Sequence, residues 1–488
     1  MKQKLSFAAA VITSIGLMLP ASVYAADTGW VGSSEMDSYM SEMMEAEKVP
    51  GMSIAIVDSD AVTFHSYGYD NMKEEIAADE YTIYELGSTT KAFTALAVLI
   101  LEEEGILDLD ADIRTYLPWL ELTHEGGPAV ITCNQLLSHT AGIPDKYYAE
   151  AMEGTDRDIM RQTAELINGK ELDFAPGDHF SYSNLGYDLL GYIIDLKCGT
   201  TYEEFVTQRI LRPLGMEHSG FHLETAQGYR LCFTNLIEYD APRYQGSLPD
   251  GYLETCAADM ALWLKAQMGI GENVPEQLQR LIQKSHSNVE PSAFVEETEE
   301  YSLYYSYGWI ISDDGSYITH SGGQPNFTSD IAIYPKENRA VCTMTNSMNS
   351  APFYVTEGIY DAWKGDTPGR DMWGADLQLD RTLSIAAVVV AVLMLLLLIG
   401  LLTQKKRLSG KTHSRLWENI RLVLGILGGL LLCSIDIAAM ILLDYTLAGA
   451  INSLWVWCPI GLCVLFWEMP LFGLLLLTAS VRRRLLSK

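Results

Sequence analysis

Ser88 and Lys91 form the first of three short groups of residues whose side chains are suited to chemistry. Residues three apart on a helix share a face, so the Lys91 ammonium can reach the Ser88 hydroxyl and help to deprotonate it. The apolar pattern of residues 91–104 predicts that helix, and Ser88 at its start would lie near the positive end of the helix dipole. The alternative is a Ser88 that only caps the helix, with Lys91 exposed to solvent.

Tyr182 and Asn184 form the second group, in a predicted loop between the turn at 175–178 and a helical pattern that begins near Leu185. A positive charge beside a phenol stabilises the phenolate. Close to a lysine, Tyr182 could therefore take up a proton and return it. Taken alone, Tyr182 would be read as a packing residue, because the chain has 26 tyrosines.

The third group is His320-Ser321-Gly322-Gly323, at the end of a strand predicted for 317–320. Glycine lets a ligand approach the backbone closely. The backbone N–H groups of such an edge can stabilise the negative charge that develops on a carbonyl oxygen during acyl transfer. Taken alone, this group is an ordinary strand end followed by a turn.

Strand patterns occur at both ends of the region that carries these groups, and helical patterns lie between them. Near the beginning, 52–57 and 62–67 predict a hairpin. We expect an α+β domain in which strands from both ends of this region form one antiparallel sheet, with helices on both faces. Four later strands predict an antiparallel meander, and three segments between the strand groups have helical period: 307–311, 317–320, 329–334 and 340–345 for the strands, and 91–104, 187–196 and 202–209 for the helices.

The two ends of the chain are apolar. Residues 1–25 combine a basic start, an apolar run and a small-residue site at 23–25, which predicts a secretory signal peptide. Three later stretches, 383–403, 422–443 and 454–479, are each long enough to cross a bilayer as a helix. Basic residues lie between the first two stretches and after the third, so the positive-inside rule makes those segments cytoplasmic. The region before the spans is then extracytoplasmic, in agreement with the signal peptide.

Two acids, Asp436 and Glu468, lie inside the predicted spans. Acids in a membrane are costly and usually face a bundle interior or a water path. They could bind a lipophilic substrate or pair between helices. Glu468 could also lie near enough to an interface to need no such role.

The formal net charge of −30 understates the acidity of the extracytoplasmic region, because both apolar ends are net basic. Such a region repels nucleic acid and anionic polymers, which excludes nucleic-acid binding and favours neutral or cationic partners. Its simplest effect is solubility. We expect no metal and no organic cofactor, because CxxC and HExxH are absent and Gly220 interrupts the spacing of His218 and His222.

Together, Ser-x-x-Lys, Tyr-x-Asn and His-x-Gly in this order resemble the serine β-lactamase and penicillin-binding-protein superfamily. The resemblance is closest to its class C β-lactamase, DD-peptidase and esterase branch. It implies a β-lactamase/transpeptidase-like domain at 26–365, followed by a linker at 366–381 and a three-helix transmembrane domain at 382–488. Four further stretches carry the resemblance, which spans about residues 36–360: 84–88, 136–144, 213–216 and 255–260.

This resemblance implies a role for each matching residue. Ser88 would be the acylated nucleophile, with Lys91 and Tyr182 as the proton-transfer pair. Asn184 would bind a substrate amide. The third group would contribute to substrate binding and to an oxyanion hole made by the backbone N–H groups of Ser88 and Gly323, with Gly322 beside it and His320 in the place of the third-motif lysine.

A catalytic domain followed by three spans also resembles the membrane peptidases that mature nonribosomal peptide prodrugs, of the colibactin-peptidase type. The positions that correspond to that group's pocket for D-asparagine carry Asn184, Glu254 and Gln324, a departure from the group's pattern. An acidic Glu254 near the pocket would suit a cationic side chain or a free amine. The alternative for Glu254 is a solvated loop acid.

The sequence therefore predicts a membrane-embedded serine hydrolase that acts on small peptides or amides containing D-amino acids. β-Lactamase and esterase activities use the same acyl-enzyme chemistry and stay open, as does the oligomeric state. A sensor that is acylated by a β-lactam and signals through its spans is an alternative from another class. A non-catalytic peptidoglycan-binding module is disfavoured because all three motifs are intact.

Overall fold

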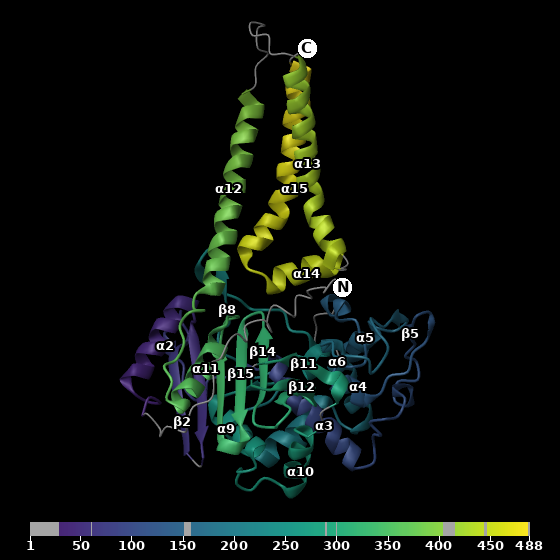
Figure 1. Cartoon of the computed structure of the whole chain (residues 1–488), viewed down its shortest axis with the longest axis vertical. Helices are drawn as coiled ribbons and strands as arrows, with labels where there is room; N and C mark the ends of the chain where they lie inside the picture. Colours follow the sequence, from purple (N-terminus) through teal and green to yellow (C-terminus); the bar gives the residue numbers. More distant parts are fainter. Residues whose placement is uncertain are drawn as a thin grey trace. The chain divides into compact units, whose positions relative to one another are not determined.

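The computed structural model describes residues 29–59, 61–150, 158–287, 290–298, 300–403, 415–443 and 447–486 (Figure 1). The described chain divides into two compact units. The larger unit contains 29–230 and 238–375, and the smaller unit contains 231–237 and 376–486. The predicted signal peptide, 1–25, lies outside the described residues.

The larger unit is built on one antiparallel sheet of nine strands. Strands from the two ends of the domain meet inside it, where β1 pairs with β16 and Ala55 lies opposite Cys342. The prediction of a single sheet made from both ends is therefore confirmed. In sheet order the strands are β11 (Phe294–Glu297), β12 (Ser302–Ser306), β13 (Trp309–Ser312), β14 (Ile318–Gln324), β15 (Phe327–Tyr334), β16 (Arg339–Thr345), β1 (Gly51–Asp58), β2 (Ala61–Asn71) and β3 (Ile76–Ala77).

Helices cover both faces of this sheet. Successive side chains of a strand point to opposite faces, and β1 is buried on both. Ile54 and Ile56 pack with helices α2 (Ser34–Glu47) and α11 (Ala351–Lys364), whereas Ala55 belongs to the larger core on the other face. The helices of that larger core include α3 (Lys91–Glu103), α6 (Asn184–Lys197) and α9 (Ala257–Met268).

Shorter elements complete the larger unit. Two of them, β4 (Tyr84–Glu85) and β10 (Glu254–Thr255), form a small sheet. In the sequence, β4 lies just before the turn that carries Ser88. That turn is the 3-10 helix η1 (Gly87–Thr90). The others are α4 (Cys133–Leu137), α5 (Asp158–Glu165), α7 (Tyr202–Val206), α8 (Leu248–Gly251) and α10 (Glu276–Ser285), with strands β5 (Leu122–His124), β6 (Gly127–Pro128) and β7 (Lys170–Glu171). Strands β8 (Tyr229–Cys232) and β9 (Asn235–Glu238) pair with each other and fall mostly in the smaller unit.

Strand β14 runs further than the predicted end at residue 320. Its last residues, to Gln324, continue the pairing with β15, because the backbone N–H and C=O groups of glycine form the same strand-to-strand hydrogen bonds as those of other residues. This extension presses against η1. A Cβ atom on Gly322 would lie 1.9 Å from the carbonyl oxygen of Leu86, so only glycine fits there without a shift of the backbone.

The smaller unit contains four helices: α12 (Ala375–Thr403), α13 (Arg415–Leu443), α14 (Leu447–Trp457) and α15 (Ile460–Leu486). Within the described residues, two segments are long and apolar enough to cross a membrane, Ala375–Thr403 and Ile460–Arg482. A shorter apolar segment, Leu422–Ser434, lies in α13. Three spans were predicted, and these findings support two.

The third predicted span, 454–479, is not one helix. Helix α14 ends at Trp457 and α15 begins at Ile460, with Pro459 between them, whose missing N–H cannot hydrogen-bond to the preceding turn. Helices α13 and α15 pack closely through glycines: a Cβ atom on Gly429 would lie 2.8 Å from the carbonyl oxygen of Gly473. The Asp436 side chain lies outside those described, and Glu468 is in α15.

The predicted linker, 366–381, is held by hydrogen bonds over its first part. The Tyr39 hydroxyl donates to the Gly369 carbonyl at 3.2 Å, and the Gly374 N–H donates to the Glu47 carboxylate at 2.5 Å. Its last part is helical, because α12 begins at Ala375. The start of α12 also carries the buried Asp380, whose carboxylate accepts a hydrogen bond from the Thr234 N–H at 2.6 Å in the same unit.

Gly322→Ala should destabilise the larger unit, because its methyl group would meet the Leu86 carbonyl, whereas a Cβ atom on Gly323 meets no described atom within 4 Å. Forcing an extra carbon into a packed site costs about 1–3 kcal/mol. We therefore expect a lower melting temperature for Gly322→Ala and a nearly unchanged one for the matched variant Gly323→Ala, measured by tryptophan fluorescence. Equal melting temperatures would contradict the close contact between β14 and η1.

Candidate active site

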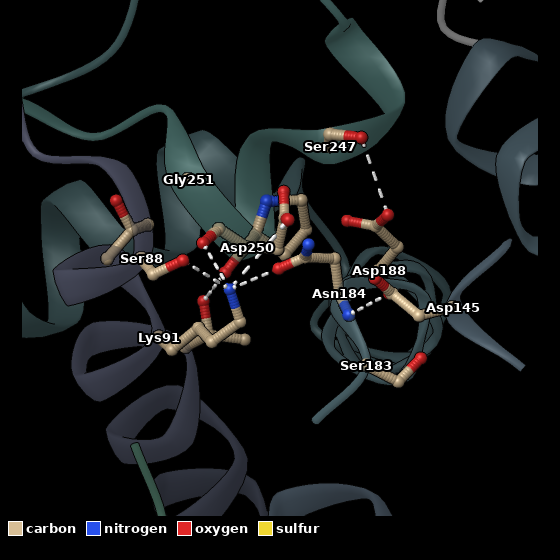
Figure 2. Close-up of polar contacts among 12 residues, drawn as sticks. Ser88, Lys91, Asp145, Ser183, Asn184, Asp188, Ser247, Asp250 and Gly251 are labelled. Atoms are coloured by element: carbon tan, nitrogen blue, oxygen red, sulfur yellow. Dashed lines mark hydrogen bonds and ion pairs between the residues drawn. The ribbon is translucent and has the colours of Figure 1, made fainter. Parts of the chain in front are cut away.

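Lys91 lies at the centre of the polar contacts around Ser88 (Figure 2). Its ammonium donates to Ser88 Oγ at 3.0 Å, to Asn184 Oδ1 at 2.8 Å and to the Asp250 carbonyl oxygen at 2.8 Å. The side chain is completely buried. A lysine ammonium has three N–H groups and no acceptor, so these three contacts use every donor of a charged Lys91.

The charge of Lys91 is stabilised by its surroundings. Burial lowers the pKa of Lys91, but Tyr182 and Asp250 outweigh burial, and the pKa of Lys91 lies above its usual value. The Asp250 carboxylate is 3.8 Å from the Lys91 Nζ atom. Lys91 is therefore an ammonium at neutral pH, which donates to the Ser88 hydroxyl and cannot at the same time accept its proton.

Tyr182 is the second proton-transfer candidate that the structure brings to this point. The Lys91 Nζ atom lies 5.0 Å from the centre of the Tyr182 ring. Its hydroxyl is buried and makes no hydrogen bond of standard geometry to the described residues. Burial raises the pKa of Tyr182, while the nearby Lys91 charge and Ser88 hydroxyl lower it in part. The Tyr182 oxygen is thus close to both Ser88 and Lys91.

Asn184 is the first residue of α6, and its position is held from both ends. Its side-chain oxygen accepts from Lys91, and its backbone N–H donates to Asp145 Oδ1 at 2.9 Å. The helix start therefore places the Asn184 side-chain amide beside the Lys91 ammonium.

His320 lies close to this group and is neutral. Its Nδ1 atom is 2.7 Å from the Ser321 carbonyl oxygen, which can only accept, so Nδ1 carries the proton. Its Nε2 atom then accepts from the Tyr305 hydroxyl at 3.0 Å. Burial and the Lys91 charge lower the pKa of His320 to about 3. His320 therefore lacks the positive charge that a lysine would bring to the third motif.

The glycines of β14 meet the turn that carries Ser88. A Cβ atom on Gly87 would lie 2.5 Å from the Gly323 nitrogen, and one on Gly322 would lie 2.9 Å from the Ser88 nitrogen. The backbone N–H groups of Ser88 and Gly323, which are expected to form an oxyanion hole, therefore both lie at the contact between η1 and β14. Gln324 secures the end of β14, because its buried amide donates to the Gly251 carbonyl at 2.6 Å.

Glu254 differs from the role considered for it. Its buried carboxylate forms an ion pair with Arg243 and accepts a hydrogen bond from the Leu223 N–H. Arg243 also binds Glu85 at 2.9 Å, on the strand next to Glu254. Because protein groups already occupy the Glu254 carboxylate, the structure gives it a role in joining β4 and β10 rather than in binding a cationic substrate.

Three carboxylates near Lys91, of which Asp188 and Asp250 are buried and Asp145 is partly buried, were missed by the sequence analysis. Asp250 contacts Lys91 directly, Asp145 receives the Asn184 N–H, and Asp188 accepts from Ser247 at 3.4 Å (Figure 2). Burial raises the pKa of Asp145 and of Asp250 to about 6, and that of Asp188 well above its usual value. No local pattern marks these residues, because they are brought together only by the fold.

His139 was also missed, although it lies in the stretch 136–144 that carries the family resemblance. Its ring is 4.2 Å from the Tyr182 ring, and its Nδ1 atom accepts from the Ser183 N–H at 3.2 Å. Burial holds the pKa of His139 well below its usual value. A neutral His139 therefore fixes the orientation of the Tyr182 loop.

One group of possible metal ligands occurs among the described residues: His218, Cys256 and Asp259, with ligand atoms within 4.8 Å of one another. Asp259 already accepts from the His218 N–H at 2.8 Å and from the Ser219 hydroxyl at 2.7 Å. Burial raises the pKa of the Cys256 thiol to about 12, which opposes the thiolate that a metal needs. These contacts instead join the first turn of α9 to the segment that contains His218 and Ser219.

His320→Gln should reduce the loss of stability at acid pH. A histidine that is protonated when unfolded but not when folded costs about 1.4 kcal/mol for each pH unit between 6.5 and its folded pKa, so about 2 kcal/mol at pH 5. Groups common to both proteins cancel in the comparison. We expect melting temperatures to fall less between pH 7.5 and 5 in His320→Gln; an equal fall would show that His320 is protonated in the folded protein.

Known proteins resemble this chain in sequence and fold. A β-lactamase family model matches residues 36–362. Protein Flp of Staphylococcus aureus is 32% identical over 319 residues, which are 64% of this chain and 62% of Flp, so the chain spans less than two thirds of that relative. Penicillin-binding protein 4* of Bacillus subtilis is 26% identical over 320 residues, 62% of this chain and 69% of that protein.

A solved structure also resembles this chain. The octameric penicillin-binding protein homologue from Pyrococcus abyssi is 29% identical, with a TM-score of 0.60 over 72% of this chain and 81% of that one. The family match covers most of the sheet and every motif residue discussed above. The chain therefore belongs to the β-lactamase family, within the serine β-lactamase and penicillin-binding-protein superfamily.

Proposed function

We propose that this protein is a membrane-anchored, extracytoplasmic peptidase or amidase that cleaves peptides containing D-amino acids through an acyl-Ser88 intermediate. The observation that carries the proposal is the contact of the buried Lys91 ammonium with Ser88 Oγ, beside Tyr182 and Asn184. A serine held by a charged group, near a phenol and an amide, has the parts needed for acyl transfer.

In the proposed reaction Ser88 Oγ attacks the substrate carbonyl carbon. The Ser88 proton passes to Tyr182 in its phenolate form, which burial disfavours and the Lys91 charge favours, and the carbonyl oxygen becomes negative between the N–H groups of Ser88 and Gly323. The C–N bond then breaks, and Tyr182 returns the proton to the leaving amine. Water hydrolyses the acyl-serine ester in a second addition and elimination, and Tyr182 accepts and returns a proton in the same way.

The substrate class is argued from the relatives and from the site. A relative named for penicillin binding is one that recognises a mimic of an acyl-D-amino-acid peptide, so the same class of amide suits this chain. Asn184, whose side-chain oxygen binds Lys91, would bind a substrate amide through its nitrogen. With a neutral His320, the site does not supply the positive charge that a third-motif lysine would offer a free carboxylate, so we favour substrates whose D-amino-acid carbonyl is an internal amide.

β-Lactam hydrolysis and ester hydrolysis are the second candidates, because the same acyl-enzyme serves them. A β-lactam-acylated sensor would share the first step but retain the acyl group. The rate at which the acyl-serine is hydrolysed separates these functions, since a sensor keeps its label and a hydrolase loses it.

Ser88→Ala should abolish covalent labelling of the purified full chain by a fluorescent penicillin and by a fluorophosphonate. The matched variant Ser181→Ala, in the loop that carries Tyr182, should label like the parent. Intact mass should show one adduct on the parent and on Ser181→Ala. In a separate assay, both proteins should hydrolyse D-amino-acid amides. Equal labelling of Ser88→Ala would refute Ser88 as the nucleophile.

We further propose that α12, α13 and α15 cross the membrane with the catalytic domain outside the cytoplasm. Two of these helices have the length and composition to span, and α13 packs against one of them through Gly425, Gly429 and Gly473. The basic residues on the 404–414 segment and after residue 481 favour a cytoplasmic position for these parts.

The topology is tested with single introduced cysteines and a membrane-impermeant maleimide. Glu272→Cys, in an exposed loop of the catalytic domain, should label in intact cells. Ser409→Cys, in the basic segment, should label only after the membrane is permeabilised. The unaltered chain, with its eight native cysteines, gives the background. Labelling of Ser409→Cys in intact cells would overturn the orientation.

A further inference from the structure

Asp250 approaches Lys91 in two ways. Its backbone carbonyl accepts one of the three ammonium hydrogen bonds, and its carboxylate oxygen Oδ2 lies 3.8 Å from the same Nζ atom. Both side chains are almost fully buried. The carbonyl contact needs only a backbone, so any residue at position 250 could provide it. The carboxylate contact depends on the aspartate itself.

We propose that Asp250 is a positioning residue of the catalytic centre: its carboxylate keeps Lys91 as an ammonium that donates to Ser88, and so leaves Tyr182 to accept the Ser88 proton. This inference rests on the proposed function and deepens it. The Lys91 ammonium has no free donor, and a buried ammonium without a nearby negative charge loses its proton readily.

The position of Asp250 is itself fixed by the fold. Helix α8 ends just after it, and the Gln324 amide binds the next residue, Gly251, from the end of β14. On the other side Thr94 donates to the Pro249 carbonyl at 2.6 Å from helix α3. These two contacts fix the backbone on both sides of Asp250. Its Oδ1 atom makes no hydrogen bond of standard geometry within the described chain.

Several other titratable groups face this pair. Asp145 and Asp188 are further carboxyl groups near Asp250, with the protonated form of Asp188 favoured by burial, and His139 and His320 are neutral neighbours of Lys91. Four tyrosines complete the surroundings of Asp250: Tyr148, Tyr182, Tyr202 and Tyr252. Asp250 is the carboxylate whose ion pair with Lys91 lies within 4 Å, so its removal should act most strongly on Lys91.

Removing the Asp250 charge has a defined sign. A negative charge raises the pKa of both neighbours, Lys91 and Tyr182, so Asp250→Asn should lower both. If activity needs Tyr182 deprotonated and Lys91 protonated, both limbs of the pH profile move to lower pH. A nearby opposite charge shifts a pKa by about 1–3 units, so we expect about that shift in the alkaline limb.

The test is the pH dependence of the rate at which a fluorophosphonate phosphonylates Ser88, with loss of fluoride, in the full chain, for the parent, Asp250→Asn, Asp250→Glu and Asp188→Asn. Asp250→Asn should shift both limbs to lower pH, Asp250→Glu should leave them in place, and Asp188→Asn should shift them less. Limbs that stay in place in Asp250→Asn, with or without a fall in rate, would overturn the inference.

A second measurement needs no variant and applies even if Asp250→Asn does not fold. In the parent protein, the rate of Ser88 labelling by the fluorophosphonate should not fall as the pH rises to about 10, because Lys91 stays charged there. An alkaline limb between pH 8 and 9 would show that Asp250 does not hold the Lys91 proton. Absence of Ser88 labelling in the parent would refute the proposed function instead, so the two failures are distinguishable.

Discussion

The contacts of one buried ammonium group organise the catalytic domain. Lys91 donates to Ser88 on its own turn, to Asn184 at the start of α6 and to the Asp250 carbonyl at the end of α8. A buried charge is costly unless all its donors are used, so the three segments must stay together for Lys91 to stay charged. The same geometry that makes the charge tolerable also aims it at the nucleophile.

The sheet supplies the rigidity that this arrangement needs. β14 runs along η1 so closely that Gly322 has no room for a side chain, which sets the distance between Ser88 and the backbone of the third motif. Gln324, two residues further along β14, binds the segment that follows Asp250. One strand therefore positions the nucleophile, the N–H groups beside it and the partner of Lys91.

Electrostatics then divides the neighbouring groups into charged and neutral ones. Burial keeps His320 and His139 neutral and favours protons on several of the buried carboxyl groups. Lys91 is the group whose charge survives, because carboxylates and a phenol surround it. A site of this kind concentrates a single positive charge near the point where a substrate carbonyl becomes negative, while Glu254 keeps its own charge paired with Arg243.

The sequence by itself determined the contacts that depend on local spacing. Ser88 and Lys91 are three residues apart, so a helix brings them together wherever it lies, and strand alternation and turns predicted β1, β2 and the final meander. The stretch 454–479 was predicted as one span, whereas the structure divides it into two helices at Pro459. Tyr182, Asn184 and His320 were found through their family resemblance rather than from their spacing.

Only the tertiary structure decided the rest, because long-range packing sets which groups meet and how much water they lose. Asp250 lies 159 residues from Lys91 in the sequence, and no periodic pattern links them. The neutral state of His320 depends on its burial, and the ion pair of Glu254 depends on an arginine from another loop. The amino-acid sequence specifies which side chains are present. The fold decides which groups surround them, and those groups decide their charge.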